Sequence, residues 1–199
     1  DDEYVRKYES TGNSPVAHTH NDDRDVVDVD FDNNGNIYSV NDGQNIVKTD
    51  FDGILQWKQS TGNSYNRSIS VDPVTGDVYV GMNNDQVKKY DTDANYDWTF
   101  TGHNDPVYSV FFDPVSQYVY TGSDDGTVRK LDTTNGNEVW QADINSGIHS
   151  VIVDSNGNVY AGGRYGRTAK IDSSGTVVWT VNDDSGNTIQ SIGISIEGS

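Results

Sequence analysis

Two short stretches carry residue types that could bind a metal ion. The stretch D-F-D-N-N-G (30–35) places side-chain oxygens at alternate positions before a glycine, which is how a calcium-binding loop begins. The candidate ligands are Asp30, Asp32 and Asn34. Tyr38 stands where a further acid is needed, and Asp and Asn are also common residues of hairpin turns. We therefore predict no metal site and keep these three residues as the alternative.

The second stretch is H-T-H (18–20), which holds two of the four histidines. In an extended strand, His18 and His20 point to the same side and could share a metal ion. No third ligand is evident in the sequence, although His103 stands in a comparable loop. We therefore interpret the two histidines as loop residues and predict that the protein holds no cofactor.

Catalytic motifs are missing from the sequence. It contains no cysteine, hence no thiol nucleophile and no disulfide, and it has no G-x-S-x-G segment of the serine hydrolases. A carboxylate pair for glycoside hydrolysis stays open, because the 31 acidic residues allow too many pairings to choose among. We predict that the protein is not an enzyme and keep a glycosidase-like enzyme as an alternative.

The net charge of −18 limits the classes of partner. Such a field repels nucleic acids and anionic membranes, and no apolar run approaches the roughly 20 residues of a membrane span. We therefore expect no nucleic-acid partner and no membrane insertion. Turn formation explains why 27 of the 31 acids are Asp, but it does not explain why only 13 residues are basic. Adaptation to high salt explains both, so we expect a halophilic origin.

Three ladders of residues reveal an internal repeat. The steps between members are 41, 41, 41 and 40 for lysine, 41, 41 and 40 for tyrosine, and 41, 42 and 39 for tryptophan. We interpret the lysines as partners of acids in neighbouring strands or units, and the aromatic residues as packing between units. The ladders are Lys7, Lys48, Lys89, Lys130 and Lys170; Tyr38, Tyr79, Tyr120 and Tyr160; and Trp57, Trp98, Trp140 and Trp179.

Each unit contains four strand-like runs separated by Gly, Asp and Asn turns, and we name these runs A to D in chain order. In the unit that begins at residue 107 they read VYSVFF, QYVYTG, TVRKLD and EVWQA. No segment shows a sustained helical period. Four-stranded units of ~40–45 residues are typical of β-propeller blades, which pack radially because one twisted blade cannot bury both its faces. We predict an all-β fold, a β-propeller.

The repeats resemble two known types of propeller. Residues 101–132 are similar to a WD-repeat blade, with Gly102 and His103 just before strand A, although Lys-Leu-Asp stands in place of the WD dipeptide. The G-x-x-x-W ending, as in Gly136 to Trp140, resembles the quinoprotein-type (PQQ-like) repeat instead. Together the resemblances cover essentially the whole chain. They imply the fold and leave the function open, because propellers host many unrelated activities.

We predict about five four-stranded blades in a single domain, 1–199. Strands C and D of the first unit (1–24) and strand A of the last (188–199) belong to one blade shared between the termini. That blade lacks a strand B. Three explanations stay open: a longer polypeptide, a strand donated by another chain, or a larger ring. The complete blades are predicted at 25–65, 66–106, 107–147 and 148–187.

Positions that differ between units are free to specialise, while shared positions build the scaffold. Five residues before the position that ends strand A, which is an Asp in four units and Ser195 in the last, each unit has a different residue, and we expect this position at the central channel. It is occupied by Val27, Arg67, Tyr108, His149 and Gln190.

The D–A and B–C loops of a propeller emerge on one common face, where the loop G-R-Y-G-R (163–167) is unusual in so acidic a chain. Arg and Tyr are also the residue types enriched at binding hot spots. The predicted partner-binding face comprises His18, His20, Arg24, Tyr65, Arg67, His103, Tyr108, His149, Arg164, Tyr165 and Arg167.

These features predict a non-catalytic interaction or assembly module, a structural component that presents one face to a protein partner or to another copy of itself. The expected location is extracellular, on the cell or virion surface of a halophilic system. The alternative is a propeller that binds a carbohydrate or another small ligand through Arg and aromatic residues at the channel mouth.

Overall fold

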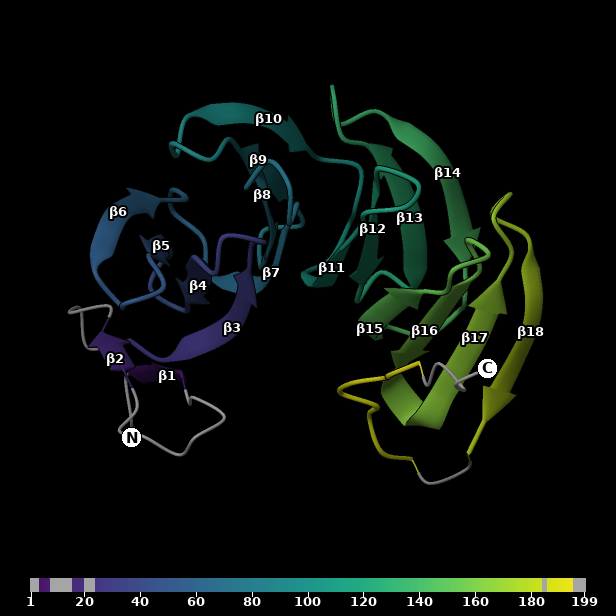
Figure 1. Ribbon diagram of the computed structural model, residues 1–199. Coiled ribbons are helices and arrows are strands. Elements are labelled where there is room, and N and C mark those ends of the chain that lie inside the picture. Colours follow the sequence, from purple (N-terminus) through teal and green to yellow (C-terminus); the bar gives the residue numbers. More distant parts are fainter. Residues whose placement is uncertain (1–3, 8–15, 20–23, 184–185, 195–199) are drawn as a thin grey trace, which may run out of the picture.

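The computed structural model describes residues 4–7, 16–19, 24–183 and 186–194, with side chains from residue 24 onward. Within these ranges the regular elements are antiparallel β-strands, apart from one 3-10 turn, η1 (Arg164–Gly166). No helix there is long and apolar enough to cross a membrane. Figure 1 shows the sheets side by side in an open arc, with the first strand of each sheet on the inside.

Each complete sheet, or blade, is a meander in which the strands follow one another in chain order, so that strand A is innermost and strand D outermost. Blades 1 and 2 contain β3 (Val26–Phe31), β4 (Ile37–Asn41), β5 (Asn45–Thr49) and β6 (Leu55–Ser60), then β7 (Asn66–Val71), β8 (Val78–Met82), β9 (Val87–Tyr90) and β10 (Tyr96–Phe100). Blades 3 and 4 contain β11 (Val107–Asp113), β12 (Tyr118–Ser123), β13 (Thr127–Asp132) and β14 (Glu138–Asp143), then β15 (Ile148–Val153), β16 (Val159–Gly163), β17 (Arg167–Ile171) and β18 (Val177–Asn182).

The predicted count of five blades is wrong, because the described residues form four complete blades. β1 (Tyr4–Lys7) and β2 (Val16–Thr19) pair with each other as a separate two-stranded sheet beside β3. The described tail, 186–194, contains no strand and bonds to blade 4. The two expected parts of a shared blade do not join, since neither has the intervening strand B as a partner.

Each A–B turn is closed by the Asp that ends strand A. The Asp32 carboxylate accepts hydrogen bonds from the backbone N–H groups of Asn34 and Asn36, both at 2.9 Å, and from the Tyr38 hydroxyl at 3.2 Å. Burial alone would raise the pKa of Asp32, but these bonds outweigh it and hold that pKa below its usual value. Asp154 makes the equivalent contacts in blade 4, so the turn chemistry repeats with the fold.

Tryptophans on the outermost strands join neighbouring blades. The indole N–H of Trp98 in β10 donates to the carbonyl oxygen of Thr133 in blade 3 at 3.0 Å. Its ring lies over Gly136 of the same turn, where a Cβ atom would come within 2.7 Å of the indole. The G-x-x-x-W pattern therefore recurs because the glycine of one blade makes room for the tryptophan of the blade before it. The equivalent bonds are Trp57 to Thr92 at 3.0 Å and Trp140 to Ser173 at 3.2 Å.

Side chains of the preceding blade also join the innermost strands. Strand A pairs only with strand B, so the backbone N–H groups along its channel edge need other acceptors. The Ser68 hydroxyl oxygen accepts the Val110 N–H at 3.1 Å, and the Ser70 hydroxyl oxygen accepts the Phe112 N–H at 3.0 Å. The other bonds of this kind are Ile69 to Asp28 at 2.9 Å, Val71 to Asp30 at 2.8 Å, Val151 to Ser109 at 3.0 Å and Ile192 to Ser150 at 3.1 Å.

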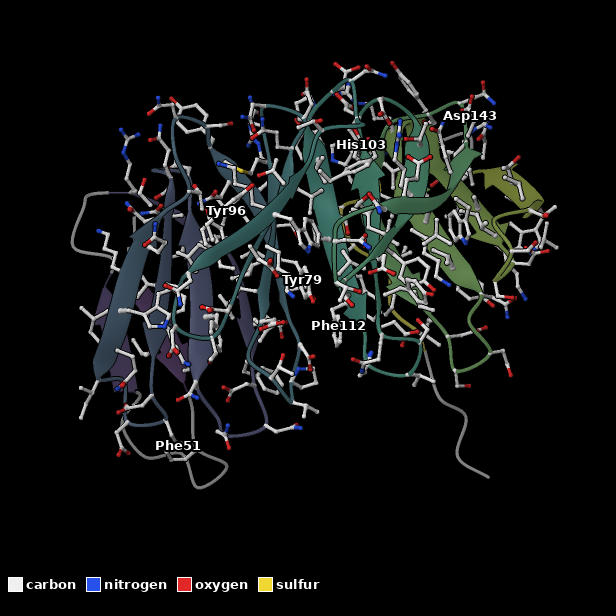
Figure 2. All side chains as sticks on the ribbon, turned by 90° about the horizontal axis from the view of Figure 1, so that it is seen from above. Phe51, Tyr79, Tyr96, His103, Phe112 and Asp143 are labelled. Atoms are coloured by element: carbon white, nitrogen blue, oxygen red, sulfur yellow. The ribbon has the colours of Figure 1, made fainter. Side chains whose placement is uncertain are left out.

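The apolar core lies between successive blades, and each core cluster combines residues of two neighbours. Tyr79 of β8 stacks on Phe112 of β11, with ring centroids 5.6 Å apart and ring planes within 5° (Figure 2). Tyr38, Tyr79 and Tyr120 are at most 1% exposed, whereas Tyr160 in the last blade is only half-buried. The prediction that the tyrosine ladder packs between units is confirmed for the first three members.

The lysine ladder contacts neighbouring strands and blades. Lys89 Nζ lies 2.9 Å from the Asp77 carboxylate and 3.0 Å from that of Asp97, as predicted. Lys48 instead donates to the carbonyl oxygen of Thr92 in the next blade at 3.2 Å. The same turn residue accepts the indole N–H of Trp57, so lysine and tryptophan together stabilise the contact between blades 1 and 2. We call each such contact between neighbouring blades a seam.

We expect Trp98→Phe to lower the free energy of unfolding by about 1 kcal/mol, because the ring packing stays and the bond to Thr133 is lost. Trp98→Ala should cost ~3–5 kcal/mol, because it also leaves a cavity between blades 2 and 3. The control is Trp179→Phe, since Trp179 lies in the last blade and is 41% exposed. Urea denaturation of the purified variants measures these changes, and equal losses for the two Phe variants would contradict the role of the seam.

Candidate functional site

The D–A and B–C loops lie on one face, as predicted, because backbone hydrogen bonds tie them together. In each blade, the N–H that begins the B–C loop donates to a carbonyl of the preceding D–A loop. Figure 2 shows His103 and Asp143 at this loop face and Phe51 at the opposite end of the blades. The four bonds are Asp42 to Asp25 at 3.0 Å, Asn83 to Tyr65 at 2.9 Å, Asp124 to Pro106 at 2.9 Å and Arg164 to Gly147 at 2.8 Å.

One cavity of about 580 Å³ is lined by all five residues of the variable position. They come from the beginnings of the innermost strands, next to the D–A loops, so the cavity forms the mouth of the channel on the loop face. Its volume suits a small ligand or a few side chains of a partner. The five residues are Val27, Arg67, Tyr108, His149 and Gln190.

Arg67, Tyr108 and His149 form a stack across blades 2, 3 and 4. The guanidinium carbon of Arg67 lies 5.4 Å from the centroid of the Tyr108 ring. The rings of Tyr108 and His149 are parallel within 8°, with centroids 4.3 Å apart. Since Arg67 belongs to the preceding blade and His149 to the following one, they cover opposite faces of the Tyr108 ring. The cavity therefore meets the edge of this ring and its hydroxyl rather than an open aromatic face.

Asn83 in the B–C loop of blade 2 holds the Arg67 side chain in place. Its side-chain oxygen accepts hydrogen bonds from Arg67 Nε at 3.1 Å and from Nη2 at 2.6 Å. A guanidinium carries five N–H donors in a planar fork, so this contact occupies one edge and leaves the outer edge free to donate. A neutral amide positions the cation without neutralising it.

Asp124 and Arg164 close the site between blades 3 and 4. Arg164 Nη2 donates to the Asp124 carboxylate, and His149 Nε2 lies 3.9 Å from the other carboxylate oxygen. That oxygen packs against Gly147, where any Cβ atom would clash with it. Burial lowers the pKa of His149, an effect that Asp124 opposes and Arg164 strengthens. The imidazole is therefore neutral at pH 7.

Below the variable position, the cavity wall consists of Asp28 and the hydroxyls of serines. Burial raises the pKa of Asp28, although hydrogen bonds from Ile69 and Ser68 act against this. Ser68, Ser109 and Ser150 each accept one backbone N–H already; the Ser68 hydroxyl donates to Asp28, whereas Ser109 and Ser150 keep their own proton to donate. The sequence contained a signal for this wall, since its residues recur at steps of 40, 41, 41 and 41, but it was not predicted. The residues are Asp28, Ser68, Ser109, Ser150 and Ser191.

The prediction that His103 belongs to the partner-binding face is wrong, because its side chain is fully buried in blade 3. Its Nδ1 lies 2.8 Å from Asp125 and its Nε2 lies 2.8 Å from the Thr121 hydroxyl. The Thr127 hydroxyl donates to Asp125 as well, at 2.7 Å. Burial alone would raise the pKa of Asp125, but the hydrogen bonds from His103 and Thr127 hold that pKa far below its usual range. His103 therefore joins two loops of one blade.

The other predicted residues of the face differ in exposure. Tyr165 and Tyr65 are 66% and 47% exposed, and Arg24 is exposed as well. Tyr165 has a φ of 59°, a left-handed backbone that turns its ring outward from η1. The Nη1 of Arg167 donates to the carbonyl oxygen of Ile144 at 3.1 Å.

The candidate metal ligands serve the fold instead. Asp30 accepts the N–H of Val71 in the next blade at 2.8 Å, and Asp32 closes its own turn with the backbone N–H of Asn34. In the part of the chain that the structure describes, no group of three or more His, Cys, Asp and Glu side chains could hold a metal ion. His18 lies in β2, but its side chain, like the whole of His20, is outside the described residues.

Comparison with known proteins agrees with this architecture. Residues 27–191 match a PQQ-like repeat family described as outer membrane protein assembly factor BamB. The chain belongs to this family. The match begins in β3 and continues past β18, so it includes all four complete blades and confirms the PQQ-like resemblance. No curated protein sequence matches the chain.

One chain of a solved mitotic checkpoint complex matches this propeller with a TM-score of 0.83 at 15% sequence identity. The match covers 95% of this chain and 60% of that chain, so this member of the BamB-type family spans less than two thirds of its structural neighbour. At this level of identity the likeness shows a shared propeller fold, and the residues of the channel mouth have to be interpreted from their own chemistry.

We expect Asp125→Asn to lower the free energy of unfolding at pH 7 by about 2 kcal/mol, because His103 and Thr127 lose a charged acceptor inside the blade. The depressed pKa of Asp125 contributes stability that is fully present above the unfolded pKa of about 4 and is lost as the pH falls toward the folded value. The variant should therefore lose less stability than the wild type on acidification below about pH 4.

Urea denaturation at a series of pH values measures both effects of Asp125→Asn. Asp52→Asn is the matched control, since it removes the same charge from an exposed turn. If the wild type and Asp125→Asn lost stability in parallel below pH 4, the network around His103 would not carry this part of the acid sensitivity.

Proposed function

We propose that this propeller is a non-catalytic interaction module that binds a protein partner on its loop face. One observation carries the proposal: a uniform scaffold holds five different side chains around a single cavity on that face. The inter-blade bonds repeat from blade to blade, while the variable position changes in every unit. A surface whose scaffold is constant and whose contact residues all differ suits the recognition of one particular partner.

The exposed residues around the cavity have the composition of a binding surface. Tyr165 and Tyr65 project from loops beside the channel mouth, and Arg164 is 43% exposed despite its ion pair with Asp124. Tyr and Arg are enriched among residues that dominate binding energy, because they combine a large contact area with directed polar groups. Both tyrosines come from loops that backbone bonds hold to the blades, so little ordering is needed on binding.

The named relatives support the same class of function. The family description is that of an assembly factor, and the structural neighbour belongs to a multi-protein complex. We include in the proposal the extracellular setting of a halophilic cell or virion surface, which the net charge of −18 supports. A carbohydrate ligand is less well supported, because both faces of Tyr108 are covered and unavailable for stacking on a sugar ring.

Site-specific photo-crosslinking in the native source tests the proposal. A photoreactive residue at position 165 samples the loop face, and one at position 115 is the control, since Val115 is 77% exposed in an A–B turn at the opposite end of the blades. We expect one dominant crosslinked protein from position 165 and none from position 115. Tyr165→Ala should then weaken the isolated partner's binding at least about tenfold.

Crosslinks from position 115 alone, or none from either position, would contradict a partner on the loop face. A purified complex that survives Tyr165→Ala and Tyr65→Ala unchanged would place the contact elsewhere on the propeller.

A further inference from the structure

The guanidinium of Arg67 is a half-buried cation that no carboxylate of the described residues neutralises. Its polar partner is the side-chain oxygen of Asn83, and its plane lies over Tyr108. The chain has 31 acidic and 13 basic residues, and Arg129 and Arg164 pair with carboxylates, in Glu138 and Asp124. Lys48 and Lys88 donate to backbone carbonyls instead, but neither lines this cavity, whereas Arg67 does. Keeping Arg67 unpaired at the cavity leaves its charge available for a ligand.

The groups next to Arg67 in the cavity are also hydrogen-bond donors. The outer edge of the guanidinium is free, because Asn83 occupies the edge formed by Nε and Nη2. The hydroxyls of Ser109 and Ser150 each accept a backbone N–H and retain a proton to donate. Tyr108 also lines the cavity, and its hydroxyl is a further possible donor. Residues with donor groups from three blades therefore line one space of about 580 Å³.

The charges around the cavity limit the ligand to a single negative charge. Arg164 is already paired with Asp124, and His149 is neutral at pH 7 because burial lowers its pKa. Asp28 adds a carboxyl group on the neighbouring wall. A second negative charge on the ligand would meet no further unpaired cation among the described residues that line the cavity, which also include Asp28, and this disfavours a phosphate dianion.

We propose that the channel mouth binds a carboxylate group through the outer edge of Arg67, with the Tyr108 hydroxyl and the serine hydroxyls as further donors. A carboxylate matches the planar fork of a guanidinium with two parallel hydrogen bonds. The group comes either from the end of a protein partner's chain or from a free monocarboxylic acid. The first source deepens the proposed function and rests on it, whereas the second would be an activity of the pocket by itself.

The test is a nuclear magnetic resonance titration of the full chain in about 1 M sodium chloride, where the Debye length of about 3 Å suppresses long-range repulsion from the acidic surface. The probes are propionate, N-acetyl-trialanine with a free carboxyl end, and the same peptide with an amidated end. We expect both carboxylates to shift the Arg67 Nε–H and His149 ring signals, and the amide to leave them unchanged. Tighter binding of the peptide than of propionate assigns the source to a chain end; equal or weaker binding assigns it to a free acid.

Three variants separate the pocket from a general effect of charge. Arg67→Gln should weaken both carboxylates at least about tenfold, and Tyr108→Phe, which keeps the ring in the stack, about threefold. Lys58→Gln removes the same charge from an exposed site on the outermost strand of blade 1, outside the predicted partner-binding face, and should leave the affinity within about twofold. Unchanged signals from the A–B turn of blade 4 in each variant show that the fold is retained.

Carboxylate binding that persists in Arg67→Gln, or equal shifts with the amidated peptide, would overturn the proposal. Absence of any response to the two carboxylates would do so as well. The loop-face proposal is independent of that result, because crosslinking from position 165 reports on a partner whether or not a carboxylate enters the channel.

Discussion

The inner edge of each blade leaves backbone N–H groups with no neighbouring strand, and side chains of the preceding blade supply their acceptors. Ser68 reaches Val110 in this way, and Ser109 reaches Val151. A buried N–H without an acceptor costs more than an ordinary hydrogen bond contributes, so these contacts set the spacing and orientation of the innermost strands. The channel mouth depends on that spacing. The stack of Arg67, Tyr108 and His149 needs three strands that each begin at the same height.

The repeat made most of the fold predictable from the sequence. Each unit forms the same turn and the same contact with its neighbour. Turn residues such as Asp32 and Asp154 therefore recur, and so does the packing of a glycine against a tryptophan, as in Gly136 and Trp98. The count of blades was wrong for a different reason. The patterns of residues 1–24 and 188–199 resemble strands, and β1 and β2 do pair with each other, but the described tail, 186–194, contains no strand. A strand forms only where a neighbour accepts its hydrogen bonds, and a repeat pattern carries no information about that.

The site was predictable where it follows the repeat and unpredictable where units differ. The five variable residues were placed at the channel because register along strand A is shared by all units. The bond from Arg67 to Asn83 and the pair of Arg164 with Asp124 involve residues that do not recur from unit to unit, so no repeat pattern in the sequence predicted these two contacts. The prediction for His103 was wrong because a histidine in a loop is ordinarily exposed, whereas hydrogen bonds with Asp125 and Thr121 hold this side chain in the interior.

The acidic residues of the chain also stabilise its turns. Many carboxylates accept backbone N–H groups of their own turn: Asp50, Asp91, Asp132 and Asp172 do so in the four C–D turns. Their charge is therefore held at the ends of the blades by local geometry. Glu has a longer side chain that does not close such a turn, which accounts for the preference for Asp within the acidic set.

Each kind of bond between blades runs in one direction along the chain. The serine acceptor belongs to the earlier blade and the N–H donor to the later one, while the tryptophan donor belongs to the earlier blade and the carbonyl to the later one. Every unit thus carries one half of a seam on each side, and the halves are interchangeable. Duplication or loss of a whole unit by recombination would bring matching halves together again. Such a change would keep the repeated serine and tryptophan contacts, while contacts that occur at one seam only, such as the pair of Arg164 with Asp124, would have to adapt afterwards.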